Sequence, residues 1–120
     1  SFTDPRSANL GWRAYREDQA PVMDTDWTAI QVGNTIPISA IDLTSNTFIL
    51  EAGFERLNGV DFRKGCYVGQ EVTARMKHKT DLRKGLAQVQ ITGDADLGDE
   101  IFANGKPAGT LLSRSGDIAI

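Results

Sequence analysis

The residues best suited to chemistry lie in one run, Lys64-Gly65-Cys66-Tyr67-Val68-Gly69-Gln70-Glu71. The run holds the only cysteine among the 120 residues, with a lysine two positions before it and a glycine on either side. It leads into a segment with a helical pattern. The backbone N–H groups and partial positive charge at a helix N-terminus favour a thiolate, and a nearby lysine adds to this effect. Cys66 is therefore a candidate reactive thiol, and Lys64 is its candidate neighbour.

The role of this cysteine is open at the level of sequence. A lone cysteine is usually a small, buried apolar residue, and that structural role is the alternative to a functional thiol. As a functional thiol, Cys66 could act as a nucleophile, as a transient ligand of iron or sulfur, or as a redox partner. A single cysteine cannot form an internal disulfide, and it cannot hold an iron–sulfur cluster without ligands from elsewhere. No resident metal site is expected.

The run resembles the K-G-C-[FY]-x-G-Q-E signature of the YgfZ-type folate-binding proteins, and other segments resemble the same family. These segments are Asp4-Pro5-Arg6, Leu10-Gly11-Trp12-Arg13, Pro21-Val22-Met23-Asp24 and the lead-in Gly59-Val60-Asp61-Phe62. The family assists the maturation or repair of iron–sulfur enzymes and is related to the T-protein of the glycine cleavage system, an aminomethyltransferase. The resemblance implies tetrahydrofolate as a ligand. It also implies iron–sulfur client enzymes or assembly proteins as partners, including enzymes of tRNA modification.

Four residues are candidate folate contacts by this resemblance: Glu17, Tyr67, Gln70 and Glu71. Glu17 corresponds to an acidic residue that binds the pterin, and a carboxylate can accept two N–H bonds from an aminopyrimidine edge. The family's glycine is replaced here by Gln19, so an ordinary surface glutamate is the alternative. Tyr67 could stack on a pterin or pack in the core. Gln70 and Glu71 could orient the cysteine loop or simply begin the helix.

Basic residues cluster after the run: Arg75, Lys77, His78, Lys79, Arg83 and Lys84. A solvated helix face explains them most simply. The functional alternative is a docking site for an anion such as a folate polyglutamate tail, an RNA backbone or an acidic protein. No aromatic residues are interleaved with the cluster, so a surface for stacking bases is not indicated and direct nucleic-acid binding is not expected.

Composition is typical of a globular protein. The chain has 40% apolar and 24% charged residues and a formal net charge of −3. No apolar stretch approaches the roughly 20 residues that a membrane-spanning helix needs, and no signal peptide is visible. A single cysteine suits a reducing compartment, and on this ground a cytoplasmic protein is predicted. The chain starts at Ser1 and ends within an apparent strand at Ile120, so we expect a fragment, and the family resemblance implies that it is a C-terminal one.

Hydrophobic periodicity predicts a helix over residues 70–79, where Val72 and Met76 share one face, and another over residues 48–57. Residues 20–47 carry many turn-forming residues and are predicted to be loop with short ordered pieces. Strands are predicted at residues 86–91, 100–103, 108–113 and 117–120, with Asn104-Gly105 as a hairpin turn.

The expected fold class is α+β. The chain would be the C-terminal part of a T-protein-like fold, with the signature loop and helix followed by a small antiparallel β-barrel. Residues 1–24 would be the end of a central folate-binding domain. Residues 25–79 would form a connecting segment that contains a helix and the signature run, and residues 80–120 would form the barrel, which we expect to be incomplete. The predicted function is that of a tetrahydrofolate-binding accessory protein for iron–sulfur cluster assembly or repair. The alternatives are a tetrahydrofolate-dependent aminomethyl or one-carbon transferase and a non-catalytic protein-interaction module.

Overall fold

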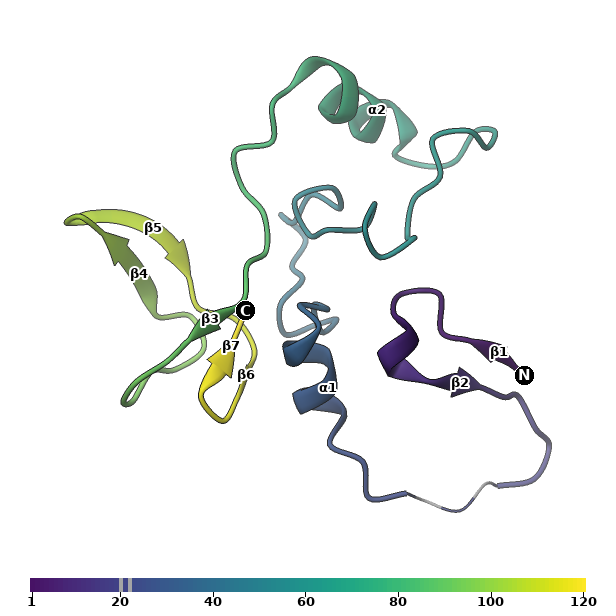
Figure 1. Ribbon diagram of the computed structural model, residues 1–120. Coiled ribbons are helices and arrows are strands. Elements are labelled where there is room, and N and C mark those ends of the chain that lie inside the picture. The colour runs from purple at the N-terminus through teal and green to yellow at the C-terminus, as the bar shows by residue number, and fades with distance from the viewer. Residues whose placement is uncertain (20, 22) are drawn as a thin grey trace.

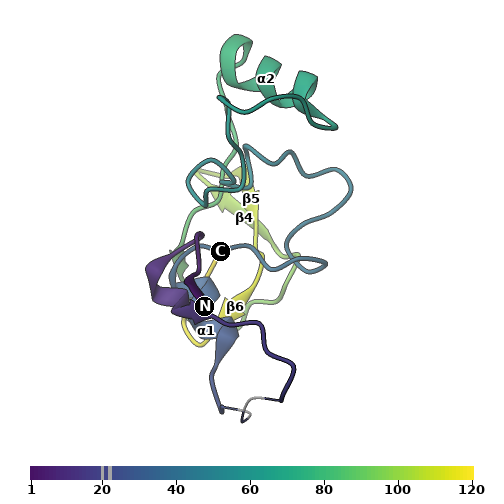
Figure 2. The same ribbon diagram turned by 90° about the vertical axis from the view of Figure 1, so that its right-hand side faces the viewer.

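The computed structural model describes residues 1–19, 21 and 23–120, and it is open rather than tightly packed (Figure 1). The radius of gyration is 16.7 Å, whereas a compact domain of this length would have about 14 Å. The principal extents of 53 × 43 × 22 Å describe a flattened molecule. In both views the helix labelled α2 stands apart, above the remaining elements (Figures 1 and 2). Among the described residues, no helix is long and apolar enough to cross a membrane.

The N-terminal part is a short antiparallel pair closed by a 3-10 turn. Strands β1 (Phe2–Thr3) and β2 (Trp12–Arg13) pair with Phe2 opposite Arg13, and η1 (Ala8–Leu10) lies between them. Gly11 has a φ of 72°, a conformation that glycine adopts at little cost, and it turns the chain from η1 into β2.

Helix α1 (Trp27–Gly33) is a short ordered piece within the region that was predicted to be mainly loop. Asp26 caps the helix by accepting a hydrogen bond from the Ala29 backbone N–H at 2.9 Å. The helix contacts strands β6 (Arg114–Ser115) and β7 (Ile118–Ala119) on one side and η1 on another. Tertiary packing therefore stabilises a helix of only seven residues, which is too short to be stable alone.

The segment predicted as a helix over residues 48–57 instead forms consecutive turns. Gly53 has a φ of 76°, which lies outside the right-handed helical region and interrupts any continuous ladder of helical hydrogen bonds. The apolar spacing still buries Leu50, Ala52 and Leu57. Leu57 joins Leu10 and Ile36 in a small core cluster.

Helix α2 (Gln70–Lys79) has the predicted bounds. Gly69 precedes it with a φ of 87°, and Lys77, His78 and Lys79 occupy its last turn, where positive charge complements the helix dipole. Val72 and Met76 lie four residues apart on this helix, as predicted, and Val72 is exposed while Met76 is half-buried. The buried residue of the helix is Thr73.

The C-terminal part contains two antiparallel sheets. One has the order β3 (Val89–Gln90), β7 (Ile118–Ala119), β6 (Arg114–Ser115). The other pairs β4 (Glu100–Ala103) with β5 (Lys106–Thr110). The antiparallel β-rich part of the predicted fold class is confirmed. The barrel is not closed in this structure, because these two sheets are separate among the described residues.

The strand predicted over residues 86–91 is a regular strand only at β3, with one further backbone hydrogen bond from the Ile91 N–H to the Asp117 carbonyl at 2.7 Å. The side-chain amide of Gln88 instead donates to the carbonyl oxygens of Val32 and Gly33, at 3.1 and 3.0 Å. This residue thus satisfies the C-terminal end of α1 rather than extending the sheet. The domain bounds 1–24, 25–79 and 80–120 remain predictions.

Candidate functional site

The signature loop is held against the start of α2 by reciprocal hydrogen bonds. The backbone N–H of Tyr67 donates to the Gln70 side-chain oxygen, and the backbone N–H of Gln70 donates to the Tyr67 carbonyl, both at 3.2 Å. Thr73 adds two bonds, from its N–H and its hydroxyl, to the Gly69 carbonyl. Gln70 therefore orients the cysteine loop, one of the two roles that the sequence left open, while its contact with folate stays a prediction.

Cys66 is exposed and makes no disulfide. It lies three residues before Gly69, the residue that precedes α2, so the loop presents it to solvent ahead of the helix. The buried structural role considered for this cysteine does not apply. Among the described residues there is no group of three or more metal-ligating side chains.

The neighbouring lysine faces the tyrosine ring. The ammonium nitrogen of Lys64 lies 5.0 Å from the centre of the Tyr67 ring, within the range of a cation–π contact. Tyr67 is half-buried, while Lys64 and the adjoining Val68 are exposed. Lys64, Cys66 and Tyr67 thus lie in one loop, which Gln70 holds from the start of α2. Glu71 lies on the first turn of α2 and pairs with Arg75 at 2.9 Å, as a helix-surface residue.

Lys77 links helix α2 to the segment that precedes it. Lys77 binds both carboxylate oxygens of Glu55, at 2.7 and 2.9 Å, and lies 5.4 Å from the centre of the Phe62 ring. His78 meets the same ring edge-on. Two members of the basic cluster, Arg75 and Lys77, are thus paired with carboxylates, which favours the surface-charge interpretation for them.

A hollow of about 370 Å³ lies between the signature loop and residues 47–60. Phe48, Phe54, Tyr67, Val68 and Val72 give it a mainly apolar lining. No sequence signal predicted it, because it depends on how the turns over residues 48–58 fold back on the loop.

Glu17 is not part of this site. It is exposed in the segment between β2 and α1, which lies at the opposite end of the molecule from α2 in both views (Figures 1 and 2). The adjoining Pro21-Val22-Met23-Asp24 element of the family resemblance includes Val22, which lies outside the described residues. The structure thus separates Glu17 from the three other candidate folate contacts.

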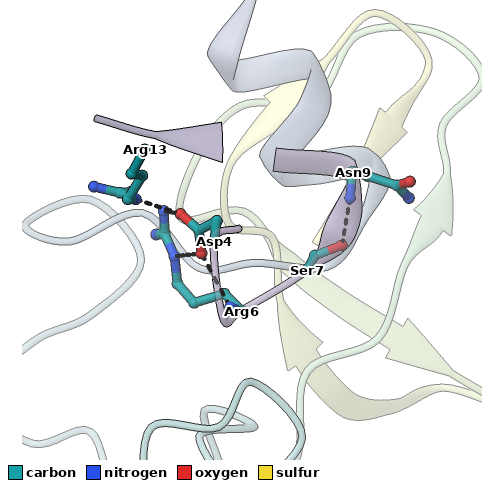
Figure 3. A network of polar contacts seen from close by, with 5 residues as sticks. All are labelled: Asp4, Arg6, Ser7, Asn9 and Arg13. Carbon is teal, nitrogen blue, oxygen red and sulfur yellow. Dashed lines mark hydrogen bonds and ion pairs between the residues drawn. The ribbon is translucent and has the colours of Figure 1, made fainter. Parts of the chain in front are cut away.

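A second polar site, not predicted from the sequence, surrounds Asp4. This buried carboxylate accepts from Arg6 at 3.0 and 2.9 Å and from Arg13 at 2.5 Å (Figure 3). The hydrogen bonds from the Arg6 side chain hold the pKa of Asp4 far below its usual range, against the opposing effect of burial, and Arg13 acts in the same direction. The only sequence signal for this site is a pair of opposite charges, Asp4 and Arg13, nine residues apart on either side of a short turn.

Known proteins resemble the chain over nearly all its length. Residues 83–120 match the family model described as the CAF17 C-terminal beta-barrel domain. The mitochondrial iron–sulfur cluster assembly factor IBA57 of Mus musculus is 31% identical over 98% of this chain and 37% of its own length. The Homo sapiens protein is 33% identical over 94% of this chain and 33% of its length. A Neurospora crassa homolog is 50% identical over 68% of this chain and 21% of its length.

The chain is similar to iron–sulfur cluster assembly factors. It spans about a third of the length of the mouse and human relatives. The predicted cytoplasmic location was wrong by this comparison, because the names of these three relatives place them in mitochondria. The cysteine content separates oxidising from reducing compartments, but it cannot separate one reducing compartment from another.

Proposed function

We propose that the protein is a mitochondrial factor in iron–sulfur cluster assembly, in which Cys66 is the working thiol and tetrahydrofolate is a ligand. Similarity to IBA57 over 98% of the chain carries the proposal. The exposed position of Cys66 ahead of α2 supports its part in it. Iron–sulfur assembly machinery and its client enzymes are the corresponding partners.

The thiol would act as a temporary ligand of an iron- or sulfur-bound cargo. Iron–sulfur clusters are commonly held by four thiolates, so Cys66 would supply one ligand and a partner protein would supply the others. An exposed loop suits this task because a partner can approach the sulfur without unfolding the site. The reciprocal Tyr67–Gln70 hydrogen bonds would keep the loop in one conformation while the cargo is exchanged.

Complementation of cells that lack the native copy tests the proposal. The wild-type protein should restore the activity of mitochondrial iron–sulfur enzymes, and Cys66→Ala should not. Arg63→Ala is the matched control, because it alters a 96% exposed side chain just before the loop. Full activity with Cys66→Ala would refute the role of the thiol, and failure of the wild type would refute the assembly function. Tetrahydrofolate-dependent methylene transfer by the purified protein would instead indicate a one-carbon transferase.

A further inference from the structure

The hollow beside the signature loop adjoins the exposed thiol. Two of the residues that line it, Lys64 and Tyr67, lie on either side of Cys66 in the chain. Its volume of about 370 Å³ is sufficient for a side chain of a partner protein. Whatever fills this hollow therefore lies next to Cys66.

Three apolar side chains of the lining are open to solvent. Val68 is fully exposed, and Phe48 and Val72 are about half exposed. They come from three different places in the chain: the turns after residue 47, the loop itself and the first turn of α2. Single exposed apolar residues are common, but a group gathered around one hollow is typical of a surface that binds another protein.

The hollow also carries one positive charge and no negative charge. Lys64 is the only charged residue in its lining. In the described part of the chain the Lys64 ammonium contacts the Tyr67 ring and makes no ion pair. It is therefore available to a carboxylate of a bound partner.

Positive charge continues from the hollow along α2 and beyond it. Residues 64–84 contain six lysine and arginine residues and two acidic residues, a net charge of +4, whereas the whole chain has a net charge of −3. All six basic side chains are exposed, and α2 stands apart from the other elements (Figures 1 and 2). The part of the molecule that presents the thiol is thus basic, while the rest of the chain is acidic.

Only part of this positive charge is neutralised within the molecule. Arg75 pairs with Glu71, and Lys77 pairs with Glu55. The other four basic residues form no ion pair among the described residues: Lys64, Lys79, Arg83 and Lys84. These four charges complement an acidic surface.

We propose that the hollow and these four basic residues form the docking surface for an acidic partner protein. An apolar side chain of the partner fills the hollow, and a carboxylate beside it binds Lys64. The other three basic residues attract the partner over a longer distance, which raises the association rate more than the final affinity. The partner would be the protein that exchanges its cargo with Cys66, so the proposal rests on the proposed function.

RNA is the other common ligand of a basic surface. Its phosphate backbone would match the four charges, but it carries no apolar side chain for the hollow. The combination of an apolar hollow with a basic surround therefore favours a protein.

Amide chemical-shift mapping by NMR tests the proposal, because it detects weak binding and locates it. Isotope-labelled protein is titrated at low salt with the acetylated and amidated pentapeptide Asp-Glu-Leu-Glu-Asp. Saturable shifts are expected at Lys64, Val68 and Val72, and none in the β4–β5 hairpin. The peptide should also slow the reaction of Cys66 with N-ethylmaleimide, and added salt should weaken binding.

Two control peptides separate the apolar contact from the charge. Serine in place of the central leucine should weaken binding by about fivefold or more, because the hollow is left unfilled. The peptide Lys-Lys-Leu-Lys-Lys, which keeps the leucine and reverses the charge, should not bind.

Matched variants test the two contacts on the protein. Lys64→Gln should weaken binding of the acidic peptide, while Lys106→Gln, at an exposed position on β5, should not. Val68→Ser should also weaken binding, and Leu97→Ser, which alters an exposed turn residue, should not. All four side chains are exposed, so thermal unfolding should not change.

Four outcomes would overturn the proposal. They are the absence of shifts around the hollow, equal affinity for the leucine and serine peptides, equal affinity in Lys64→Gln and Lys106→Gln, and displacement of the peptide by oligouridylate that binds more tightly. The last would identify an RNA surface. Cys66→Ala should bind the peptide like the wild type, so failure of docking and failure of the thiol in complementation can be told apart.

Discussion

The carboxylate of Asp42 is buried against Ser113, which lies 71 positions later in the chain. It accepts from the Ser113 backbone N–H at 2.8 Å and from the hydroxyl at 2.7 and 2.8 Å. Its second oxygen also accepts from the Ile38 N–H at 2.7 Å. These bonds join the segment after α1 to the sheet that contains β6, so they fix the C-terminal sheet relative to the rest of the molecule.

Ser113→Ala should therefore destabilise the protein by about 1–3 kcal/mol, because a buried carboxylate loses a hydroxyl donor. The free energy of unfolding in urea measures the effect. Ser45→Ala, at an exposed position, is the matched control and should change stability by less than about 0.5 kcal/mol. Equal stability of the two variants would show that the Asp42–Ser113 contact does not hold the sheet in place.

Asp4 should make the protein sensitive to acid. Its pKa in the folded protein is far below the usual 3.8, and a carboxyl with a lowered pKa contributes stability that is present at neutral pH and lost as pH falls. The free energy of unfolding should decline below about pH 4. Asp4→Asn should lower stability at neutral pH and reduce this decline.

Urea unfolding at about pH 7, 5 and 3 measures both effects. Asp94→Asn, which neutralises an exposed carboxyl in a turn, is the control and should keep the wild-type profile. A decline with the same slope in Asp4→Asn and wild type would mean that other groups cause the acid sensitivity.

Local sequence signals were sufficient for part of the fold. Helix α2 has the predicted bounds, and Asn104-Gly105 forms the predicted hairpin turn with φ values of 52° and 73°. Both depend on residues close in sequence: helical periodicity in one case, and a pair that tolerates positive φ in the other. The grouping of Tyr67 with Gln70 was predictable for the same reason.

Other parts depend on distant contacts. Helix α1 is short and is held by β6, β7 and the Gln88 side chain, none of which a local pattern reveals. In residues 48–57 the apolar residues have helical spacing, but Gly53 has a φ of 76° and the segment forms turns instead of a helix. A hollow lined by Trp12 and Trp27 forms only because α1 lies beside β2, so no local sequence pattern predicts it.

Cys66 should react readily in the native protein, because the structure exposes it. A maleimide should label one thiol per chain, at a rate within about threefold of the rate in urea. The Cys66→Ser protein should not be labelled and should unfold at the wild-type temperature, since an exposed side chain is replaced. Protection of the native thiol by more than about tenfold would show that another part of the molecule covers the loop.

Gly59 should be intolerant of a side chain because of Phe54. A Cβ at Gly59 would lie 2.9 Å from Phe54 Cδ2, closer than such atoms normally approach. Gly59→Ala should cost about 1–3 kcal/mol of unfolding free energy, because the Phe54 ring must move. Gly85→Ala is the control, since open space surrounds Gly85 and its φ is not positive.

A double-mutant cycle separates this contact from a general effect of the substitution. If the Phe54 ring causes the cost, Gly59→Ala should be nearly neutral when Phe54 is already alanine. The same cost in both backgrounds would contradict this explanation. Because Gly59 and Phe54 line the hollow beside Tyr67 and Val68, movement of the ring should also shift the signature loop. Cys66 labelling should therefore change in Gly59→Ala and remain normal in Gly85→Ala.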